Sequence, residues 1–424
     1  MYLRGSKWSL RQRRPRVNWF LIIIVIALIG IVTYVDRFIL PTAQSPFLPT
    51  MTPTREAESY VADAEALFNQ GKLLESIDAY REAVRIQPED PSTYIALARV
   101  QIFAGKYDDA LVNAENSLLL NNNNSMAYAI RGWALTYKLS YTDADDTLKK
   151  ALQLDPANGQ AHAYDAFLYG KMYENDAGPY PKPLDTAISE SNAAISLAPD
   201  ALEAHWARAY ILYQTGNLED ARDQYLDAIA INGKIAAIHL ELGKTYRLLN
   251  VIDQAIQEYT LANTLNPSDY WPELYSSRAD LVIGENSKAL QWARQALQDD
   301  PANPDLHGNL GYMLFKNDQY PAAIDELELA INGGKTEDGT VVAPMDHTAT
   351  DTWVNKYYYA YAWSLAAANR CSEVILLTQK IRDYFSWDDY AELNAAGAEE
   401  DCAQRLKTPS PRPAEATPTM TATP

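Results

Sequence analysis

The chain has 424 residues, of which 47% are hydrophobic and 21% are charged, and its formal net charge is −19. That length is too great for one ordinary globular core and fits two or three domains, or one repeat array. So acidic a chain is a poor match for nucleic acid or an anionic membrane surface, and we expect neither as its ligand.

Residues 1–18 are predicted to be a basic cytoplasmic segment. Its six cations, with no acidic residue among them, are Arg4, Lys7, Arg11, Arg13, Arg14 and Arg16. Residues 19–35 follow without a single charge. A helix of this length rises roughly 25 Å, at the lower limit for a hydrocarbon core about 30 Å thick. We therefore predict a transmembrane signal-anchor helix at 19–35.

The charge in front of this segment also predicts its orientation. Cations stay on the cytoplasmic side, so the chain after residue 35 is expected to be extracytoplasmic and the protein single-pass. A cleaved signal peptide is the alternative, although Pro41 before Ala43 makes a poor cleavage site. Whether the anchor is cleaved stays open.

Two segments of biased composition flank the central region. Residues 36–56 are rich in proline and threonine and are predicted to be an extended linker. Residues 408–424 form a tail of similar composition that we expect to be disordered.

Between residues 57 and 337 the sequence repeats with a period near 34. The clearest recurring phrase ends a helix with proline and occurs at 76–88, 144–156, 255–267 and 289–301. Small residues stand at its first and eighth positions, which allows two helices to approach closely. Upstream of each phrase lies a second helical stretch that ends in a turn. Gly71, Gly105, Gly216 and Gly284 share one position in that turn. Each unit is thus predicted to be a pair of antiparallel helices.

The pattern resembles the tetratricopeptide repeat (TPR) family, as found in membrane-anchored bacterial-type TPR proteins. The sixth unit carries the family's residues at Leu242, Gly243, Tyr246, Ala255, Tyr259, Ala262 and Pro267. The resemblance implies an all-α, right-handed superhelical solenoid of antiparallel helix pairs. Eight units are expected to start near residues 57, 91, 125, 159, 202, 236, 270 and 304.

The array departs from a regular repeat in three places. The fourth unit has an insertion at 171–183, and a loop at 338–352 follows the eighth unit. Residues 353–407 are predicted to form a degenerate ninth unit with a capping helix, which covers the exposed apolar end. Cys371 and Cys402 fall in this last region, where stacking could join them in a disulfide or leave two separate buried thiols.

In the resembled family, extended peptides lie along the concave surface formed by the first helices. By register, the candidate groove residues here are Phe68, Arg99, Phe103, Trp133, Tyr137, Phe167, Trp206, Tyr210, Tyr213, Lys244, Arg247, Trp271, Arg278, Tyr312, Phe315 and Lys316. Aromatic rings with interspersed cations suit an extended peptide that carries acidic groups or a C-terminal carboxylate. The alternative is that many of these rings only pack between neighbouring helices.

No motif in the chain indicates catalysis. HExxH, GxSxG, GxxxxGK[ST] and GxGxxG are all absent from the sequence. Four of the five histidines recur at one position of the repeat, which favours packing over metal binding. We expect no enzyme activity, cofactor, metal or small-molecule substrate. The favoured hypothesis is a membrane-tethered scaffold for a protein or peptide partner. The alternative is an assembly factor of a cell-envelope complex that uses the convex face or the inserted loops.

Overall fold

The computed structural model describes residues 18–35, 37, 55–177, 182–348 and 352–407. It divides into two units, residues 1–55 and residues 56–424, which are treated separately here. Most of the predicted basic segment 1–18, most of the linker 36–56 and all of the tail 408–424 lie outside the described residues.

The first unit contains helix α1 (Trp19–Tyr34), whose sixteen residues bury no side chain. The Thr33 hydroxyl donates a hydrogen bond to the Ile29 carbonyl of the same helix at 2.9 Å. Within the part of the chain that the structure describes, no helix is both long enough and apolar enough to cross a membrane.

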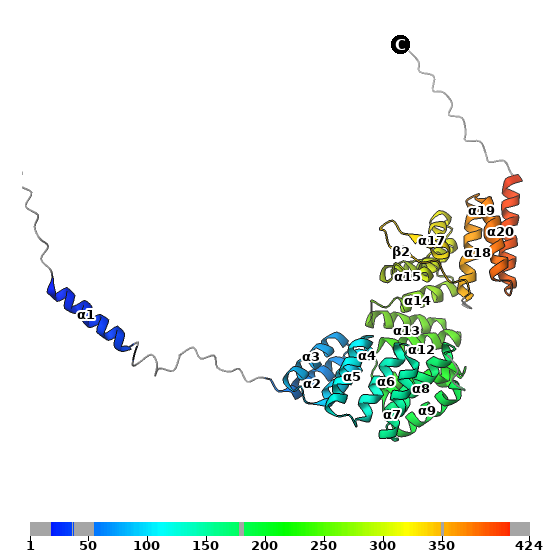
Figure 1. Ribbon diagram of the computed structural model, residues 1–424. Helices are drawn as coiled ribbons and strands as arrows, with labels where there is room; N and C mark the ends of the chain where they lie inside the picture. Colours follow the sequence, from blue (N-terminus) through cyan, green and yellow to red (C-terminus); the bar gives the residue numbers. More distant parts are fainter. Residues whose placement is uncertain (1–17, 36, 38–54, 178–181, 349–351, 408–424) are drawn as a thin grey trace, which may run out of the picture. The chain divides into compact units, whose positions relative to one another are not determined.

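The second unit is an array of helix pairs, which confirms the predicted all-α solenoid; Figure 1 shows the pairs stacked one after another. The first eight helices of the array are α2 (Ala57–Asn69), α3 (Leu73–Ile86), α4 (Pro91–Phe103), α5 (Tyr107–Leu120), α6 (Ser125–Tyr137), α7 (Tyr141–Leu154), α8 (Gly159–Glu174) and α9 (Pro183–Leu197). The next eight are α10 (Leu202–Gln214), α11 (Leu218–Ile231), α12 (Ala236–Leu248), α13 (Ile252–Leu265), α14 (Tyr270–Val282), α15 (Asn286–Asp299), α16 (Pro304–Lys316) and α17 (Tyr320–Asn332).

Local signals begin and end these helices. At the start of α4 the Asp90 carboxylate accepts hydrogen bonds from the backbone N–H groups of Ser92 and Thr93, which would otherwise lack partners. The turn inside each pair passes through the left-handed region, with φ of +71° at Gly105 and +60° at Leu139. Glycine adopts this conformation at no steric cost, whereas leucine does so under strain.

Small residues hold the two helices of a pair together. Ala255 and Ala262, at the first and eighth positions of the repeated phrase, are completely buried in α13. On the facing helix α12, a Cβ atom added to Gly243 would lie 2.5 Å from the Tyr259 ring. The helices therefore approach too closely for any larger residue at this point.

Both inserted regions contribute residues to helices or strands. Residues 171–174 extend α8 by a turn and bury Met172, so only the remainder of the insertion connects α8 to α9. After α17, strands β1 (Gly334–Lys335) and β2 (Val341–Val342) form a small antiparallel hairpin. Its Val342 side chain is buried, and the N–H of Met345 bonds to the Ala330 carbonyl of α17 at 2.9 Å.

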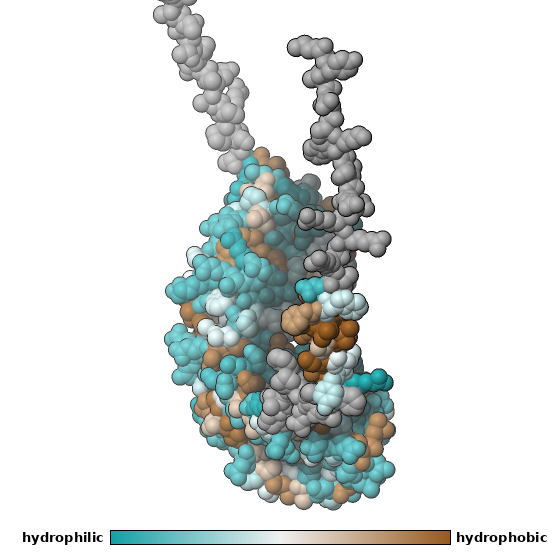
Figure 2. Space-filling model, turned by 90° about the vertical axis from the view of Figure 1, so that its left-hand side faces the viewer, coloured by the Kyte–Doolittle hydropathy of each residue, from teal (hydrophilic) through white to brown (hydrophobic). Residues whose placement is uncertain are grey.

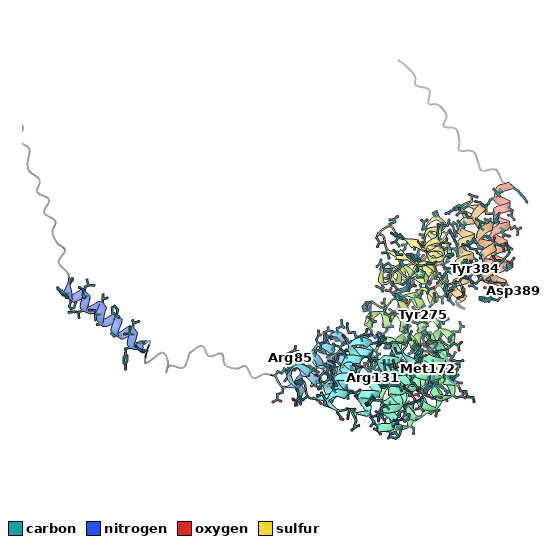
Figure 3. All side chains as sticks on the ribbon, viewed as in Figure 1. Arg85, Arg131, Met172, Tyr275, Tyr384 and Asp389 are labelled. Carbon is teal, nitrogen blue, oxygen red and sulfur yellow. A yellow bond between two sulfur atoms is a disulfide. The ribbon has the colours of Figure 1, made fainter. Side chains whose placement is uncertain are left out.

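Three helices complete the array: α18 (Thr352–Ala367), α19 (Cys371–Tyr384) and α20 (Asp389–Lys407). Tyr384 and Asp389, labelled in Figure 3, bracket the connection between the last two. A disulfide joins Cys371 to Cys402, with Cα atoms 5.6 Å apart. In the chain-entropy account, closing a loop of 31 residues contributes about 3–4 kcal/mol. The bond holds α20 against the start of α19.

The face in Figure 2 is mainly hydrophilic. Apart from one compact brown group beside the grey trace, its hydrophobic residues are dispersed among hydrophilic ones. Single exposed apolar side chains are ordinary on soluble surfaces, so this face gives no reason to place a binding site there.

Candidate functional site

The aromatic residues predicted to line the inner surface lie against one another in the N-terminal half. The Phe103 ring centroid is 5.3 Å from those of Phe68 and Trp133 and 6.0 Å from that of Trp206. The Trp206 ring in turn lies 5.0 Å from Phe167. Five first helices, α2, α4, α6, α8 and α10, thus converge on one cluster of rings. We call this group the aromatic cluster.

Burial sorts the predicted groove residues into three groups. The buried ones are Phe68, Trp133, Phe167, Trp206, Tyr210, Arg278 and Tyr312. The half-buried ones are Arg99, Phe103, Tyr137, Tyr213, Lys244, Arg247 and Phe315. The exposed ones are Trp271 and Lys316. The rings of the first group pack between helices, as the alternative in the sequence analysis anticipated, and leave little of their surface for a ligand.

Arg99 pairs with a carboxylate that comes from a distant unit. Its Nε atom lies 2.5 Å from Oε1 of Glu203 in α10, 104 residues further along the chain. The Glu203 side chain is only 1% exposed. Burial opposes its ionisation, but the nearby guanidinium outweighs this and lowers the pKa of Glu203. The pair is a charged bridge between the second and fifth units.

Two further cations of the inner surface, Lys244 and Arg278, also pair with carboxylates of this chain. Lys244 Nζ lies 2.9 Å from Glu241 Oε2 on the same helix. Arg278 contacts Asp305 at 3.0 Å and donates to the Tyr357 hydroxyl at 2.9 Å. These contacts neutralise the positive charges that the sequence hypothesis had offered to an acidic peptide. The expected clamp for a carboxylate therefore has no support from the arrangement of these three cations.

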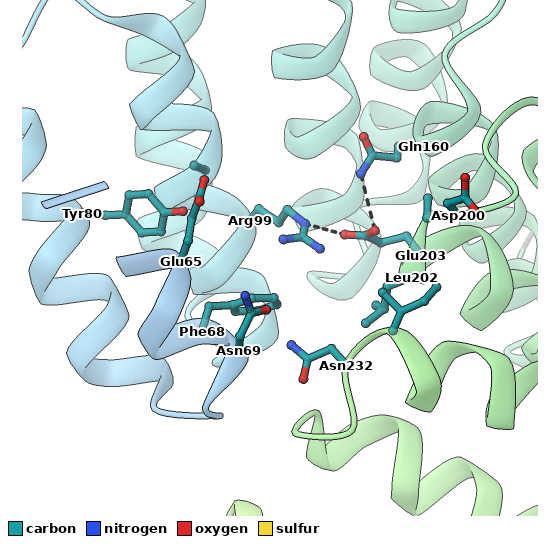
Figure 4. A pocket seen from close by; sticks show the side chains of 13 residues that line it. Glu65, Phe68, Asn69, Tyr80, Arg99, Gln160, Asp200, Leu202, Glu203 and Asn232 are labelled. Atoms are coloured by element: carbon teal, nitrogen blue, oxygen red, sulfur yellow. Dashed lines mark hydrogen bonds and ion pairs between the residues drawn. The ribbon is translucent and has the colours of Figure 1, made fainter. Parts of the chain in front are cut away.

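A cleft of about 440 Å³ opens beside the Arg99–Glu203 bridge. Its walls come from α2, α3, α4, α8, α10 and the end of α11, with the residues just before α10 and just after α11, as Figure 4 shows. Apolar surface is provided by Phe68 and Leu202, and polar groups by Glu65, Asp200 and Asn232. We call this space the inner cleft. It combines aromatic surface, amides and carboxylates at a place where segments far apart in sequence meet.

A second cleft, of about 980 Å³, lies on the side where the helix-pair turns of the first two units face the loops of the sixth and seventh. Its lining includes Lys72 and Tyr107 on one side and Lys234 and Asp269 on the other. The Tyr107 ring stacks on Tyr137, one of the predicted groove residues, at 5.1 Å. Cations and anions are mixed here, so the cleft shows no preference for a ligand of one charge.

Of the residues that line the inner cleft, the sequence analysis named Phe68 and Arg99 but not the polar residues Glu203, Asp200 and Asn232. Glu203 occupies the second position of its helix, whereas Arg99 and most of the predicted groove residues occupy the ninth, twelfth or thirteenth position of theirs. Asp305, the partner of Arg278, occupies the same second position in α16. The sequence feature that could have predicted these two ion pairs is an acidic residue at the second position of one first helix together with an arginine at the ninth position of another.

The repeat-spaced histidines are structural links between units. In each, Nε2 bonds to a backbone carbonyl six residues earlier, at Pro156, Pro199, Gly233 or Pro301. In each, Nδ1 bonds to a side chain of the second helix, at Glu190, Gln224, Glu258 or Glu326. The hydrogen bond with Glu190 raises the pKa of His162. These imidazoles join each helix pair to the end of the preceding one.

Comparison with known proteins identifies the repeat. Family profiles described as tetratricopeptide repeat match residues 57–90, 184–234 and 277–337. The chain therefore contains tetratricopeptide repeats, as predicted.

Two curated relatives match parts of the chain. Human protein O-mannosyl-transferase TMTC1 is 24% identical over 181 residues, which are 43% of this chain and 20% of that protein. The Arabidopsis thaliana protein CTR9 homolog is 22% identical over 292 residues, 64% of this chain and 25% of that protein. The chain thus spans a quarter or less of the length of these relatives.

Two solved structures of bacterial proteins match part of the chain. A thermophilic TPR protein of Thermus thermophilus is 20% identical with a TM-score of 0.39, covering 45% of this chain and 100% of that one. Pseudomonas aeruginosa pilF is 18% identical with a TM-score of 0.37, covering 50% of this chain and 92% of that one.

Proposed function

We propose that the protein is a TPR scaffold that binds an extended segment of a partner protein along the concave surface of its first helices. The observation that supports this is the inner cleft, where polar groups surround apolar surface beside a rigid aromatic cluster. Rigid aromatic surface provides contact area at low entropic cost, and convergent polar groups orient a ligand. Repeat arrays of this kind generally use such extended surfaces for binding.

The proposal includes a membrane tether at residues 19–35. Helix α1 is apolar on all sides and buries none of its side chains within its own unit. Sixteen residues rise roughly 24 Å, so a crossing would require local thinning of the bilayer or additional residues at either end. The cations before this helix would place the repeats on the extracytoplasmic side. Alkaline carbonate extraction of native membranes tests the tether, which predicts that the full chain stays in the pellet.

A photo-crosslinking experiment tests the binding surface. Benzoylphenylalanine is introduced in place of Asn69, an exposed residue of α2 that lines the inner cleft. Matched variants carry it at Asp146 on α7, at Tyr173 in the insertion of the fourth unit and at Val341 in β2, all of them exposed. The full chain is irradiated in its native membranes, and crosslinked peptides are mapped by mass spectrometry.

We expect the Asn69 variant to crosslink to one contiguous segment of a single partner, and a synthetic copy of that segment to compete. The Asp146 variant should give no such product. Products confined to the Tyr173 or Val341 variants would overturn the groove proposal and favour an assembly factor that acts through its inserted regions.

A further inference from the structure

The inner cleft already holds one cationic side chain of the protein itself, that of Arg99. The Arg99 guanidinium is bonded to Glu203, and it lies 4.9 Å from the centroid of the Phe68 ring and 5.2 Å from that of Phe103. The amide of Gln160 donates to the second oxygen of Glu203 at 3.4 Å. A carboxylate held in place beside two aromatic faces is a favourable environment for a cation.

The remaining charge on the cleft is negative. Glu65 and Asp200 are exposed, and within the described part of the chain their carboxylates take part in no hydrogen bond or ion pair. They stand on opposite sides, Glu65 on α2 and Asp200 just before α10, as Figure 4 shows. Because Arg99 and Glu203 neutralise each other, these two carboxylates give the cleft its net charge. That charge complements a basic ligand and repels the acidic peptide that the sequence analysis favoured.

A buried donor without a partner faces the same space. Asn232 is only 6% exposed, and its Oδ1 atom accepts a hydrogen bond from the Lys234 N–H at 2.9 Å. Its Nδ2 atom has no hydrogen-bond partner among the described residues. Figure 4 shows this amide extending from the loop after α11 toward the side of the cleft that carries Asn69. An unsatisfied buried donor is costly, and a backbone carbonyl of an extended peptide would satisfy it.

We propose that the inner cleft binds an arginine or lysine side chain of an extended partner peptide. The basic group lies between Glu65 and Asp200, and Asn232 Nδ2 donates to a main-chain carbonyl of the same peptide. This rests on the proposed function, since it names the chemistry of the segment bound there. It also replaces the acidic ligand of the sequence analysis, because Arg99, Lys244 and Arg278 already have carboxylate partners.

The test uses the full chain and pools of capped nonapeptides. Each pool has one fixed central residue, which is arginine, lysine, glutamine, leucine or glutamate, and random residues elsewhere. Bound peptides are quantified by mass spectrometry. We expect the arginine and lysine pools to be enriched about tenfold over the glutamine pool at low salt, and less at high salt.

Three variants assign the effect to the cleft. E65Q/D200N should reduce the enrichment of basic pools to about that of the glutamine pool. E89Q/D146N removes the same charge from two exposed positions outside the cleft and should leave the enrichment unchanged. N232A should weaken all pools by about threefold without changing their order, because it removes a contact to the main chain.

The outcomes separate this inference from the proposed function. Peptides that bind without preference for a basic centre, or with preference for glutamate, would overturn the inference and leave the peptide scaffold standing. A complete absence of peptide binding in the unmodified chain and in every variant would overturn both. A variant with Arg11, Arg13, Arg14 and Arg16 changed to glutamine tests self-occupancy. If peptides bind only to that variant, the occupant is the chain's own basic segment and not a partner.

Discussion

The six helix pairs from α2 to α13 and the pair that begins with α14 bury very different side chains, although both are built from the same hairpin. From Ala64 to Tyr259 the buried apolar and aromatic residues belong mostly to one continuous cluster, which also reaches Ala279 of α14. In contrast, α14 buries Glu273, Ser277 and Arg278, and a second large cluster begins only at Ala289. The helix-pair backbone therefore forms at α14 without a continuous apolar interface, provided that small residues and turn residues stay at their positions in the repeat.

The interface between α14 and its neighbouring helices, called the seam below, is held by hydrogen bonds and an ion pair instead. Ser277 Oγ donates to the Ala289 carbonyl at 2.9 Å, and Asn309 Nδ2 donates to Ser277 Oγ at 3.1 Å. Arg278 adds its bonds to Asp305 and Tyr357. Such a network stabilises only while every member is satisfied, whereas apolar contacts tolerate small shifts. We therefore expect the array to unfold in two steps that divide at α14.

The largest predicted effect tests the apolar side of this comparison. Trp133 is fully buried and stacks on Tyr164 with ring centroids 4.4 Å apart. Trp133→Ala should lower the free energy of unfolding of the N-terminal step by about 4 kcal/mol, since it removes a large buried ring. Urea denaturation followed by circular dichroism measures this. Trp271→Ala, at a ring that is 40% exposed, is the control and should cost about 1 kcal/mol or less. Equal losses in the two variants would contradict the proposed core.

The Arg99–Glu203 bridge is a largely buried ion pair inside the mainly apolar half. Glu203→Ala should destabilise the N-terminal step by about 3 kcal/mol, because it leaves Arg99 without a counter-charge in a mostly enclosed position. The double variant R99M/E203L should recover most of that loss. A double-mutant cycle in urea gives the coupling free energy. A loss below about 0.5 kcal/mol in Glu203→Ala would show that the bridge does not hold the second and fifth units together.

The sequence predicts the local features of this fold well, because local residues encode them. The positive φ angles of Gly71 and Gly105 fall at the turn that the repeat indicated. The helices α12 and α13 likewise fall on either side of the turn expected in the sixth unit. In these cases the signal and the structure lie within one repeat of about 34 residues, and no long-range information is needed.

The candidate site could be predicted only in part. Register places Arg99 and Trp133 on the inner face, but it does not give the path by which the array brings α10 back to α4. Glu203 is 104 residues from Arg99, and their contact depends on the accumulated rotation of the intervening pairs. Trp206, the fifth residue of α10, is buried, whereas Trp271, the second residue of α14, is exposed, so these two tryptophans of first helices differ in repeat position as well as in surroundings. Repeat position thus predicts which face a residue occupies, but not which partner it meets.

A pH dependence is expected in both regions, because burial raises the pKa of Asp165 in α8 to about 8, and Glu273 carries the contribution of the polar contacts around α14. Burial and the neighbouring Asp299 raise the pKa of Glu273 to about 7. Because the pKa of Glu273 is higher in the folded chain than in the unfolded chain, protonation of Glu273 stabilises the fold. This contribution is complete below about pH 4.5 and is lost as the pH rises through 7. The C-terminal step should therefore lose about 2 kcal/mol between pH 5 and pH 8, measured by urea denaturation.

Glu273→Gln should remove most of that pH dependence, while Asp253→Asn, at an exposed position of α13, should leave it intact. If the Glu273→Gln variant keeps the full slope, then other groups carry the pH dependence and the seam at α14 is not its source.

The smallest predicted effect concerns the turns that both regions share. Leu139 has a φ of +60° at the position where Gly105 has +71°. Leu139→Gly should raise the free energy of unfolding of the N-terminal step by about 1 kcal/mol, because it relieves backbone strain at an exposed side chain. Gly105→Ala is the matched opposite. No atom lies within 4 Å of the added Cβ, so its loss of about 1 kcal/mol would come from the backbone alone. Thermal unfolding of both variants should shift only the N-terminal transition, and a shift in the C-terminal transition would mean that α14 does not divide the array.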